Sequence, residues 1–600
     1  MEEKKMKKRH RLAMLGSAAL LTLTLAACSN GSNNSSVKTP KLPQTYSASA
    51  KASPKANDGT LKIGEVSDSP FTGISSPTLA SVATDADVFA PGGQGNLFAT
   101  DNNYKIVNGG MANLKLDKKA NTATITLRKN AKWSNGTPVT AKDIEYAYEV
   151  IANPDTKSQQ YSGDFENIKG MKDYHEGKSD TISGITYPDG EKGKTAVIHF
   201  DHLTPAMQYA GNSFIWGSVE PYEYLKDVKI ADLVSSDKIR KDPIFTGAYK
   251  LDKVVEGEST SWSPNKYYWG KKAKIKHVDI RVVSTSNVTA ALKAKKYDFL
   301  QGGASAADRP EISKLKDYQI VGKPAFAYSY FGFNLGHMDP KTGKQVTDKN
   351  KKMSNKNLRK AMMYAIDLDQ VAKKFGNGVS WRANTLLPPV FKDLYNAKTP
   401  GFKYNMKKAN KLLDDAGYKK KGKWRAQPNG KPLVINFAVS SSSATANATH
   451  KYELQQWRKL GLNVKYTSGK PMEFNSFDSA IQKPDQKNID VWNGAWSLSS
   501  EPTPTQLYGQ NAPYNMGHFV SKENTKLLNN MNNSKAWNHK YRAKQFKDWQ
   551  AYMNKETAYA PDSFSLSWEP VNKRVKGYSV KPADGDNSFS NLQLTQENTK

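Results

Sequence analysis

Residues 121–151 read NTATITLRKNAKWSNGTPVTAKDIEYAYEVI and combine three local signals in one short segment. Apolar residues alternate with threonines at its start, which is the two-residue period of a half-buried strand. Asn135-Gly136 then marks a turn. Thr140, with Asp143 three residues later, forms a capping box at the start of a helix. We therefore predict a strand, a turn and a capped helix, in that order.

The middle of this segment, TLRKNAKWSNGTPVTAKDI at 126–144, resembles the signature of the family 5 extracellular solute-binding proteins, the peptide- and nickel-binding components of ABC importers. Residues 245–300, which contain FTGAYKLDKVVEGESTSWSPNKYYWG, are similar to a hairpin of the same family and the elements that follow it. YFGFNLG at 330–336 and LRKAMMYAIDLDQVAKKF at 358–375 are similar to its third-lobe entry. SDSPFTGISS at 67–76 resembles the Gram-positive oligopeptide-binding lipoproteins in particular.

This resemblance implies an α/β fold, the two-lobed type II periplasmic-binding-protein fold with an additional small middle lobe. A chain of 600 residues is too long for one ordinary core, which also favours several lobes. The expected parts are a signal peptide (1–27), a lipidated cysteine with a flexible tether (28–58), lobe I in three pieces (59–109, 221–312 and 563–600), lobe II (110–220) and lobe III (313–562).

The residue patterns within the expected third lobe support an α/β arrangement independently. Apolar stripes at helical spacing alternate there with short runs at strand spacing. The expected elements are helices at 354–375 (capped by Ser354), 405–417 (ended by Gly417) and 451–460, and strands at 433–440 and 462–466. Helices that alternate with strands indicate an α/β lobe.

The first residues have the pattern of an export signal. A lysine- and arginine-rich start, MEEKKMKKRHR, precedes about sixteen apolar or small residues at 12–27. A membrane-spanning helix needs roughly 20 apolar residues. A positive start, a short apolar core and small residues at its end are typical of a secretory signal. A short membrane anchor is the alternative.

Cys28 is the only cysteine in the chain, and Leu25-Ala26-Ala27-Cys28 resembles the lipobox of bacterial lipoproteins. In that family the thiol accepts diacylglycerol, so Cys28 is expected to carry a lipid and no disulfide is possible. The polar segment that follows buries too little apolar surface to fold and is predicted to be a tether. We therefore expect a chain anchored by membrane lipid to the extracellular face of the cell membrane.

The formal net charge of +32 raises the question of a polyanionic partner. The lysines are scattered along the whole length, and export argues against nucleic acid as that partner. We interpret the charge as a solvated basic surface that faces an anionic wall or lipid headgroups.

No catalytic, metal-binding or cofactor-binding pattern stands out. His175-Glu176 lacks the second histidine of the zinc-protease motif, and residues 92–95, which are glycine-rich, lack the Lys-Ser/Thr ending of a phosphate loop. We therefore expect neither an enzyme nor a cofactor.

The segment VWNGAWSLSSEPTPTQLYG at 491–509 is the best candidate for a ligand wall. In the resembling family this segment lines the cleft, where an extended peptide lies as an added strand. Gly494 allows close backbone approach, and tryptophan rings supply contact area at low entropy cost. The alternative is that the tryptophans belong to the core. The peptide-binding residues that we expect are Phe71, Gly73, Trp492, Asn493, Gly494, Ala495, Trp496, Ser497, Leu498 and Glu501.

One position departs from the family pattern. Many members carry an aspartate in this segment that pairs with the amino terminus of the peptide. Leu498 stands in that place here, and Glu501 is close but offset. We therefore hypothesise that the amino terminus of the peptide is not held, so that longer peptides can extend out of the cleft.

The function implied by the resemblance is a receptor, expected to be a monomer, that binds oligopeptides between two lobes and passes them to the permease subunits of an ABC importer. A ligand that contacts both lobes would favour their closure. The alternatives are a receptor for a peptide pheromone or a nickel complex, and an exported wall-binding or adhesive protein. A surface peptidase lacks any catalytic motif.

Overall fold

The computed structural model describes residues 38–156, 158–441 and 444–600. The expected signal peptide and Cys28 lie outside these residues. The structure differs from the expected tether (28–58) in its second half. Strand β1 (Thr45–Tyr46) pairs with β24 (Tyr578–Ser579), and α2 (Pro54–Asn57) follows it. Ala48 and Ala56 bury their side chains there, so this stretch is part of the folded body despite its polar composition.

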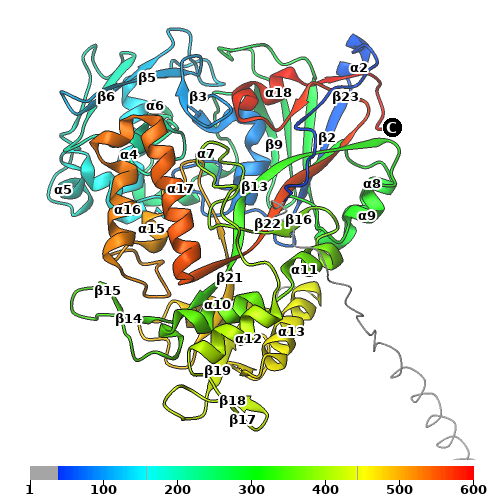
Figure 1. The fold of residues 1–600 in the computed structure, drawn as a ribbon. Helices are drawn as coiled ribbons and strands as arrows, with labels where there is room; N and C mark the ends of the chain where they lie inside the picture. The colour runs from blue at the N-terminus through cyan, green and yellow to red at the C-terminus, as the bar shows by residue number, and fades with distance from the viewer. Residues whose placement is uncertain (1–37, 157, 442–443) are drawn as a thin grey trace, which may run out of the picture. The chain divides into compact units, whose positions relative to one another are not determined.

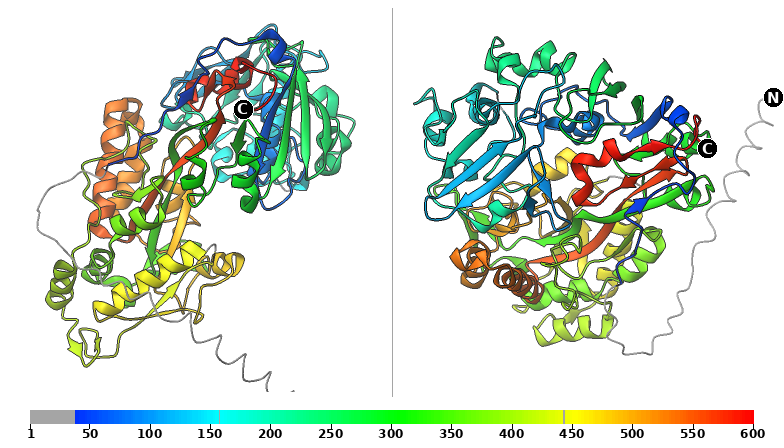
Figure 2. Two further views of the ribbon diagram at one scale, coloured as in Figure 1. Left: turned by 90° about the vertical axis from the view of Figure 1, so that its right-hand side faces the viewer. Right: turned by 90° about the horizontal axis from the view of Figure 1, so that it is seen from above.

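One sheet of 11 strands forms the centre of the fold, in the order β20-β19-β21-β13-β22-β12-β2-β11-β10-β9, with β16 also paired to β22. Its two long strands, β13 and β22, run antiparallel side by side through its middle (Figures 1 and 2). The bounds are β2 (Thr60–Val66), β9 (Tyr249–Val255), β10 (Ser259–Pro264), β11 (His277–Val283), β12 (Phe299–Gln301), β13 (Tyr318–Phe333), β16 (Ser380–Arg382), β19 (Val434–Ala438), β20 (Asn463–Tyr466), β21 (Val491–Ser497) and β22 (Tyr559–Asn572).

Parallel pairing occurs at two places in this sheet. On one side of the long pair, β2 is parallel to both β11 and β12. On the other side, β19 is parallel to both β20 and β21. Ligands of open α/β sheets bind outside the carboxyl ends of parallel strands, so these two edges are where a site is expected.

A separate sheet in the order β5-β6-β8-β7 contains the segment from which the fold was predicted. Its strands are β5 (Ala112–Asp117), β6 (Thr122–Leu127), β7 (Ile185–Thr186) and β8 (Thr195–His199). Gly136 takes the turn with φ +95°, and α4 (Ala141–Ala152) follows. The Thr140 N–H donates to Asp143 Oδ2 at 2.9 Å. The predicted strand, turn and capped helix are therefore confirmed.

The helices predicted beyond residue 350 are present with altered ends. The helix expected at 354–375 is split into α10 (Lys356–Tyr364) and α11 (Leu368–Phe375). Asn355, not Ser354, caps α10, and Asp367 caps α11 by accepting from the Gln370 N–H at 2.9 Å. Helix α12 (Met406–Asp415) is followed by Gly417 at φ +81°, as predicted, and α13 (Ala444–Lys459) begins earlier than expected.

Shorter elements and two further long helices complete the chain. Helices α16 and α17 lie side by side (orange in Figure 1). The remaining helices are α3 (Ala83–Val88), α5 (Met171–His175), α6 (Tyr222–Leu225), α7 (Asp237–Arg240), α8 (Val288–Lys293), α9 (Arg309–Ile312), α14 (Phe474–Ile481), α15 (Thr505–Tyr508), α16 (Lys522–Asn532), α17 (His539–Glu556) and α18 (Ser588–Asn591). The remaining strands form the two-stranded pairs β3 (Ala99–Thr100) with β4 (Ile106–Val107), β14 (Gly336–Met338) with β15 (Gln345–Thr347), β17 (Lys420–Lys421) with β18 (Trp424–Arg425), and β23 (Val575–Lys576) with β25 (Gln593–Leu594).

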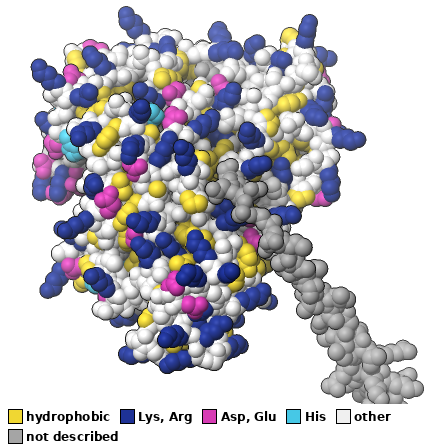
Figure 3. All heavy atoms as spheres, in the orientation of Figure 1, with side chains coloured by type: hydrophobic (Ala, Val, Ile, Leu, Met, Phe, Trp, Pro, Cys, Tyr) yellow, Lys and Arg dark blue, Asp and Glu magenta, His cyan; other side chains and the backbone are white. Residues whose placement is uncertain are grey.

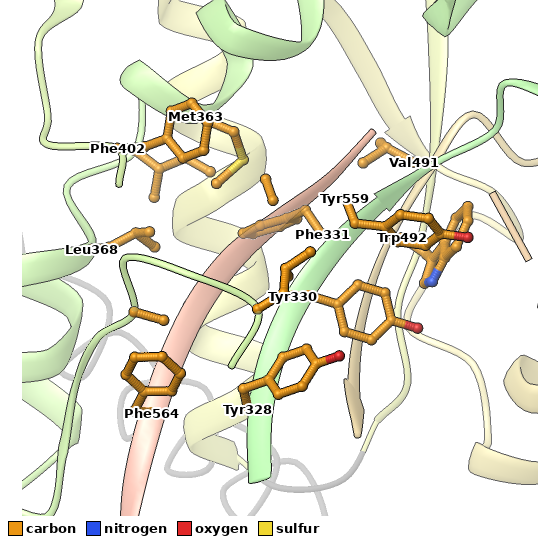
Figure 4. Close-up of a cluster of buried hydrophobic side chains, with 14 of the residues drawn as sticks. Tyr328, Tyr330, Phe331, Met363, Leu368, Phe402, Val491, Trp492, Tyr559 and Phe564 are labelled. Atoms are coloured by element: carbon orange, nitrogen blue, oxygen red, sulfur yellow. The ribbon is translucent and has the colours of Figure 1, made fainter. Parts of the chain in front are cut away.

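The buried apolar side chains fall into separate cores. The largest lies around β13, β21 and β22 and includes Phe331, Trp492 and Tyr559 (Figure 4). A second core, within residues 97–219, fills the space between the four-stranded sheet and α4. A third joins β2, β10 and β11 to the carboxyl-terminal segment. Several cores in one chain agree with the expectation from its length.

Lysine and arginine side chains are spread over the face shown in Figure 3, with acidic side chains between them. This agrees with the scattered lysines of the sequence. Within the described residues, no helix combines the length and the apolar character that crossing a membrane requires.

Candidate functional site

Strand β21 places the predicted ligand wall beside the long strand β13. Gly494 is paired with Tyr330, and Trp496 with Tyr328. The Trp496 ring stacks on the Tyr330 ring, with centroids 6.2 Å apart and an interplanar angle of 8°. A Cβ at position 494 would lie 3.2 Å from the Tyr330 ring, so the glycine makes room for this tyrosine. Trp496 is half-buried, which leaves part of its ring available to a ligand.

Two of the predicted residues lie in cores. Trp492 has no exposed surface and packs against Tyr559, with ring centroids 6.3 Å apart. Phe71 is 2% exposed and meets Phe89 edge to face. For Trp492 this is the core location that the sequence left open as the alternative, whereas no core location was considered for Phe71. A contact of either ring with a ligand stays a prediction.

The opposite face of β21 carries polar contacts. The Asn493 side chain donates to Asp562 Oδ2 at 3.2 Å. Burial, together with the nearby Glu453 carboxylate, raises the pKa of Asp562 to about 7. Glu453 is fully buried and lies 3.0 Å from His450 Nδ1. Ala495 and Ser497, on the same face as Asn493, are exposed and free to contact a ligand.

Gly73 lies in a rigid loop after β2. The N–H groups of Thr72 and Gly73 donate to Asp85 Oδ1 at 2.8 and 2.9 Å, and the Thr72 hydroxyl donates to the other carboxylate oxygen. Gly73 has φ +82°, a conformation that favours glycine. Asp85 is fully buried, so one side chain fixes the backbone of this loop.

Glu501 is engaged within the protein. Its carboxylate accepts hydrogen bonds from the Arg542 guanidinium and from the Thr503 hydroxyl and N–H, the last two at 2.8 and 3.1 Å. The side chains of Glu501 and Arg542 are 6% and 1% exposed. A carboxylate that is buried and already paired with a guanidinium is not available to bind a peptide ammonium. Arg542 lies on α17, far along the chain, and no pattern in the sequence predicts this pairing.

Three of the predicted residues, Ser497, Leu498 and Glu501, line a cavity of about 290 Å³. Across from them the lining includes Asp164 and Phe214, which belong to the part of the chain that carries the four-stranded sheet. Ser500 Oγ donates to Ala210 O at 2.7 Å, and Gln506 Nε2 to Asp164 Oδ2 at 3.3 Å, so the segment 497–506 is joined directly to that part. Phe71 and Gly73 do not line this cavity.

The chain matches a known family over most of its length. The model described as "Bacterial extracellular solute-binding proteins, family 5 Middle" matches residues 105–518. The oligopeptide-binding protein OppA of Lactococcus lactis subsp. cremoris (strain SK11) is 42% identical over 576 residues, which are 95% of this chain and 96% of that protein. OppA of Bacillus subtilis (strain 168) is 24% identical over 98% of this chain and 99% of that protein.

Solved structures agree with these matches. A structure of lactococcal OppA, complexed with an endogenous peptide in the closed conformation, is 41% identical and superposes with a TM-score of 0.77 over 89% of this chain and all of that chain. NikZ from Campylobacter jejuni in complex with Ni(L-His) has a TM-score of 0.64 at 19% identity and covers 89% of this chain and 99% of that chain. At that identity the likeness concerns the fold alone.

Proposed function

Because the chain belongs to the family 5 bacterial extracellular solute-binding proteins, we propose that it binds oligopeptides outside the cell and delivers them to the permease of an ABC importer. Its fold is the two-lobed type II periplasmic-binding-protein fold with an additional middle lobe. The observation that carries the proposal is 42% identity to an oligopeptide-binding protein over 95% of the chain. The family is one of receptors, and we propose that this member catalyses no reaction.

In this proposal the carboxyl-terminal half of β21 and the segment after it form one wall of the peptide site. Ala495 and Ser497 are exposed there, and the half-buried Trp496 ring offers apolar area. An extended peptide gains affinity from main-chain hydrogen bonds, while roomy pockets accept different side chains. A peptide that touches both lobes binds their closed arrangement better and shifts the population toward it.

We also propose that the amino terminus of the peptide is not held at this wall. Leu498 carries no charge, and the carboxylate of Glu501 is paired with Arg542. Acetylation of a peptide should therefore leave its affinity unchanged within about threefold, a difference below about 1 kcal/mol. Loss of binding on acetylation would contradict this part of the proposal.

The membrane attachment and the lobe limits complete the proposal. We propose a lipid at Cys28, a location on the extracellular face of the cell membrane, a monomeric receptor and lobe boundaries at 110, 221, 313 and 563. Two lipid chains hold a protein firmly, whereas one holds it weakly. Mass spectrometry of the membrane-extracted protein tests the anchor through a diacylglycerol-modified Cys28 at the amino terminus.

Native mass spectrometry of the protein purified from its own cells tests the main proposal. We expect a series of adducts whose masses correspond to peptides and which disappear after unfolding and refolding. Titration of the refolded protein with synthetic peptides should then restore binding. A single small-molecule or metal-complex adduct would contradict the proposal, and so would a refolded protein that binds no peptide.

A further inference from the structure

Three neighbouring strands place polar side chains in one row on the same face of the central sheet. Glu65 is the sixth residue of β2, and its Cα partner is Gln301, the last residue of β12. Phe299 pairs with Val571 in antiparallel register, and continuing that register sets Glu569 of β22 opposite Gln301. Paired residues point to the same side of a sheet, so the three side chains are neighbours.

All three side chains present hydrogen-bond acceptors that have no donor. Glu65 is 1% exposed, and neither of its carboxylate oxygens has a hydrogen-bond partner. Gln301 Oε1 and Glu569 Oε2 are also buried without a partner. Unpaired buried polar groups are costly and rare, and four such oxygen atoms in one row call for an explanation. Apart from protons that the two carboxyl groups can carry themselves, no donor among the described residues meets these oxygen atoms.

The charges around the row indicate which kind of donor it lacks. Asp87 of α3 adds a third carboxylate, and it raises the pKa of both Glu65 and Glu569. Lys323 of β13, a cation that acts on Glu569, holds its ammonium over the Phe326 ring at 5.4 Å and the Tyr104 ring at 5.8 Å. Lys323 lowers the pKa of Glu569, but it is not among the groups that shift Glu65. Among the described residues, none of the groups that shift the pKa of Glu65 is positively charged.

The row of Glu65, Gln301 and Glu569 lies at the edge of the sheet where open α/β sheets bind their ligands. Glu65 and Gln301 are at the carboxyl ends of the parallel strands β2 and β12. Gly302 follows directly, with φ +76°, and a Cβ there would lie 2.8 Å from Glu65 Oε1. The backbone thus leaves space beside the carboxylate that any other residue would fill.

We propose that Glu65, Gln301 and Glu569 form a binding site for a cationic group of the bound peptide, an ammonium or a guanidinium. The proposal rests on the proposed function and adds a preference to it. Such groups carry several donors and one positive charge, which match a row of acceptors beside carboxylates. A metal ion fits less well, because no cluster of three or more His, Cys, Asp or Glu side chains within the described residues is arranged to hold one.

The protonation of the row gives a second signature of binding. Burial is the main cause that raises the pKa of Glu65 to about 9 and that of Glu569 to about 8. In the empty site both carboxyl groups therefore keep their protons to a higher pH than ordinary glutamates do. A cation bound between them favours the ionised carboxylates, so binding should release protons to the buffer.

The test uses N-acetylated nonapeptides of alanine and serine in which one lysine occupies each position in turn, each matched by the same peptide with norleucine. Isothermal titration at pH 7.5 should give at least one position where lysine binds about tenfold more tightly than norleucine. The double variant Glu65→Gln, Glu569→Gln should reduce this ratio to below threefold and leave the norleucine affinity unchanged. Because the released protons are taken up by the buffer, the measured binding enthalpy of wild type should change with the ionisation enthalpy of the buffer. The binding enthalpy of the double variant should change much less.

Two controls make the outcome specific. Glu258→Gln changes an exposed carboxylate of the same sheet region and should keep the lysine preference. Lysine-free peptides with a free α-amine test the other source of an ammonium, and a loss confined to them in the double variant assigns the site to the amino terminus. The cation site alone is overturned by a lysine preference that survives the double variant, or by equal affinity of the lysine and norleucine series in wild type together with no loss for the free-amine peptides in the double variant. If neither series binds, the proposed function fails with it.

Discussion

Arg574 and Asp298 form a bidentate ion pair where the carboxyl-terminal segment meets the central sheet. Arg574 Nε lies 2.6 Å from Asp298 Oδ1, and Nη2 lies 2.6 Å from Oδ2. Both side chains are fully buried. Asp298 Oδ2 also accepts from the Lys62 N–H at 2.8 Å, and the guanidinium reaches the Thr60 carbonyl, so the pair connects β2 to the chain end.

Asp298→Asn should destabilise the protein because it leaves the Arg574 guanidinium buried without a counter-charge. Breaking a buried pair from one side costs about 3–5 kcal/mol. Urea unfolding followed by tryptophan fluorescence measures this. The matched control is Glu258→Gln, which removes an exposed pair with Arg281 and should cost less than about 1 kcal/mol. Similar losses in the two variants would contradict the expected role of burial.

Trp496→Ala and Trp492→Ala should separate ligand contact from core packing on the same strand. Trp496 is half-buried, so its loss should weaken peptide binding about tenfold with a modest loss of stability. Trp492 is fully buried, so its loss should cost about 3–5 kcal/mol of unfolding free energy. Peptide titration and urea unfolding of each variant check this, and equal stability losses would contradict it.

Leu498→Asp should create a preference for a free amino terminus. Leu498 lines the same cavity as Ser497 and Glu501, is half-buried, and has no charge of its own to pair with a peptide ammonium. A new carboxylate should favour free peptides over their N-acetylated forms by about tenfold, which corresponds to about 1.4 kcal/mol. Leu498→Asn, of the same size but neutral, is the control and should show no such preference. An unchanged ratio in the aspartate variant would place the peptide's first residue elsewhere.

The stability of the protein should fall as the pH rises from about 6 to 9.5. The pKa of Glu65 is about 9 in the folded protein, against an ordinary value of 4.5, so the folded state binds more protons than the unfolded state between these values. The stability that this group contributes is complete below about pH 4.5 and is lost as the pH rises through 9. Glu569 acts in the same direction, and the groups that face the pair are Asp87 and Lys323.

Glu65→Gln removes one of these titrations. The stability curve of the variant should therefore be flatter, by on the order of 4 kcal/mol at pH 9.5 relative to pH 6. Urea unfolding at four pH values measures the difference between the variant and wild type. A wild-type curve parallel to that of the variant would mean that Glu65 is ionised in the folded protein at neutral pH.

The sequence predicted the fold correctly where capping residues and hydrophobic periodicity indicated the same elements. The strand, turn and capped helix at 121–151 were predicted correctly because their capping residues and periodicity lie within one short segment. The helix at 354–375 was predicted as one because its apolar stripe continues across residue 367. Asp367 ends that continuity, since its side chain binds the Gln370 N–H and starts a new helix.

The candidate site was harder to predict from the sequence, because the contacts that define it join residues far apart along the chain. Nothing near Glu501 in sequence indicates that Arg542 neutralises it. The row of Glu65, Gln301 and Glu569 depends on strand order and register, which separate those residues widely along the chain. The side chains at 492 and 496 look alike in sequence, yet one is core and the other half-buried.

The packing of the residues around β1 would also limit how far the receptor can stand from a bilayer if Cys28 carries the proposed lipid. A lipid on Cys28 would lie 14 residue steps before Leu42, which packs against the largest core, whereas the expected tether spans 30 steps from Cys28 to residue 58. At 3.3–3.6 Å per residue, 14 residue steps span about 50 Å at most. With such a lipid, Leu42 would stay within that distance of the membrane surface, which limits how far from the bilayer a permease can be approached.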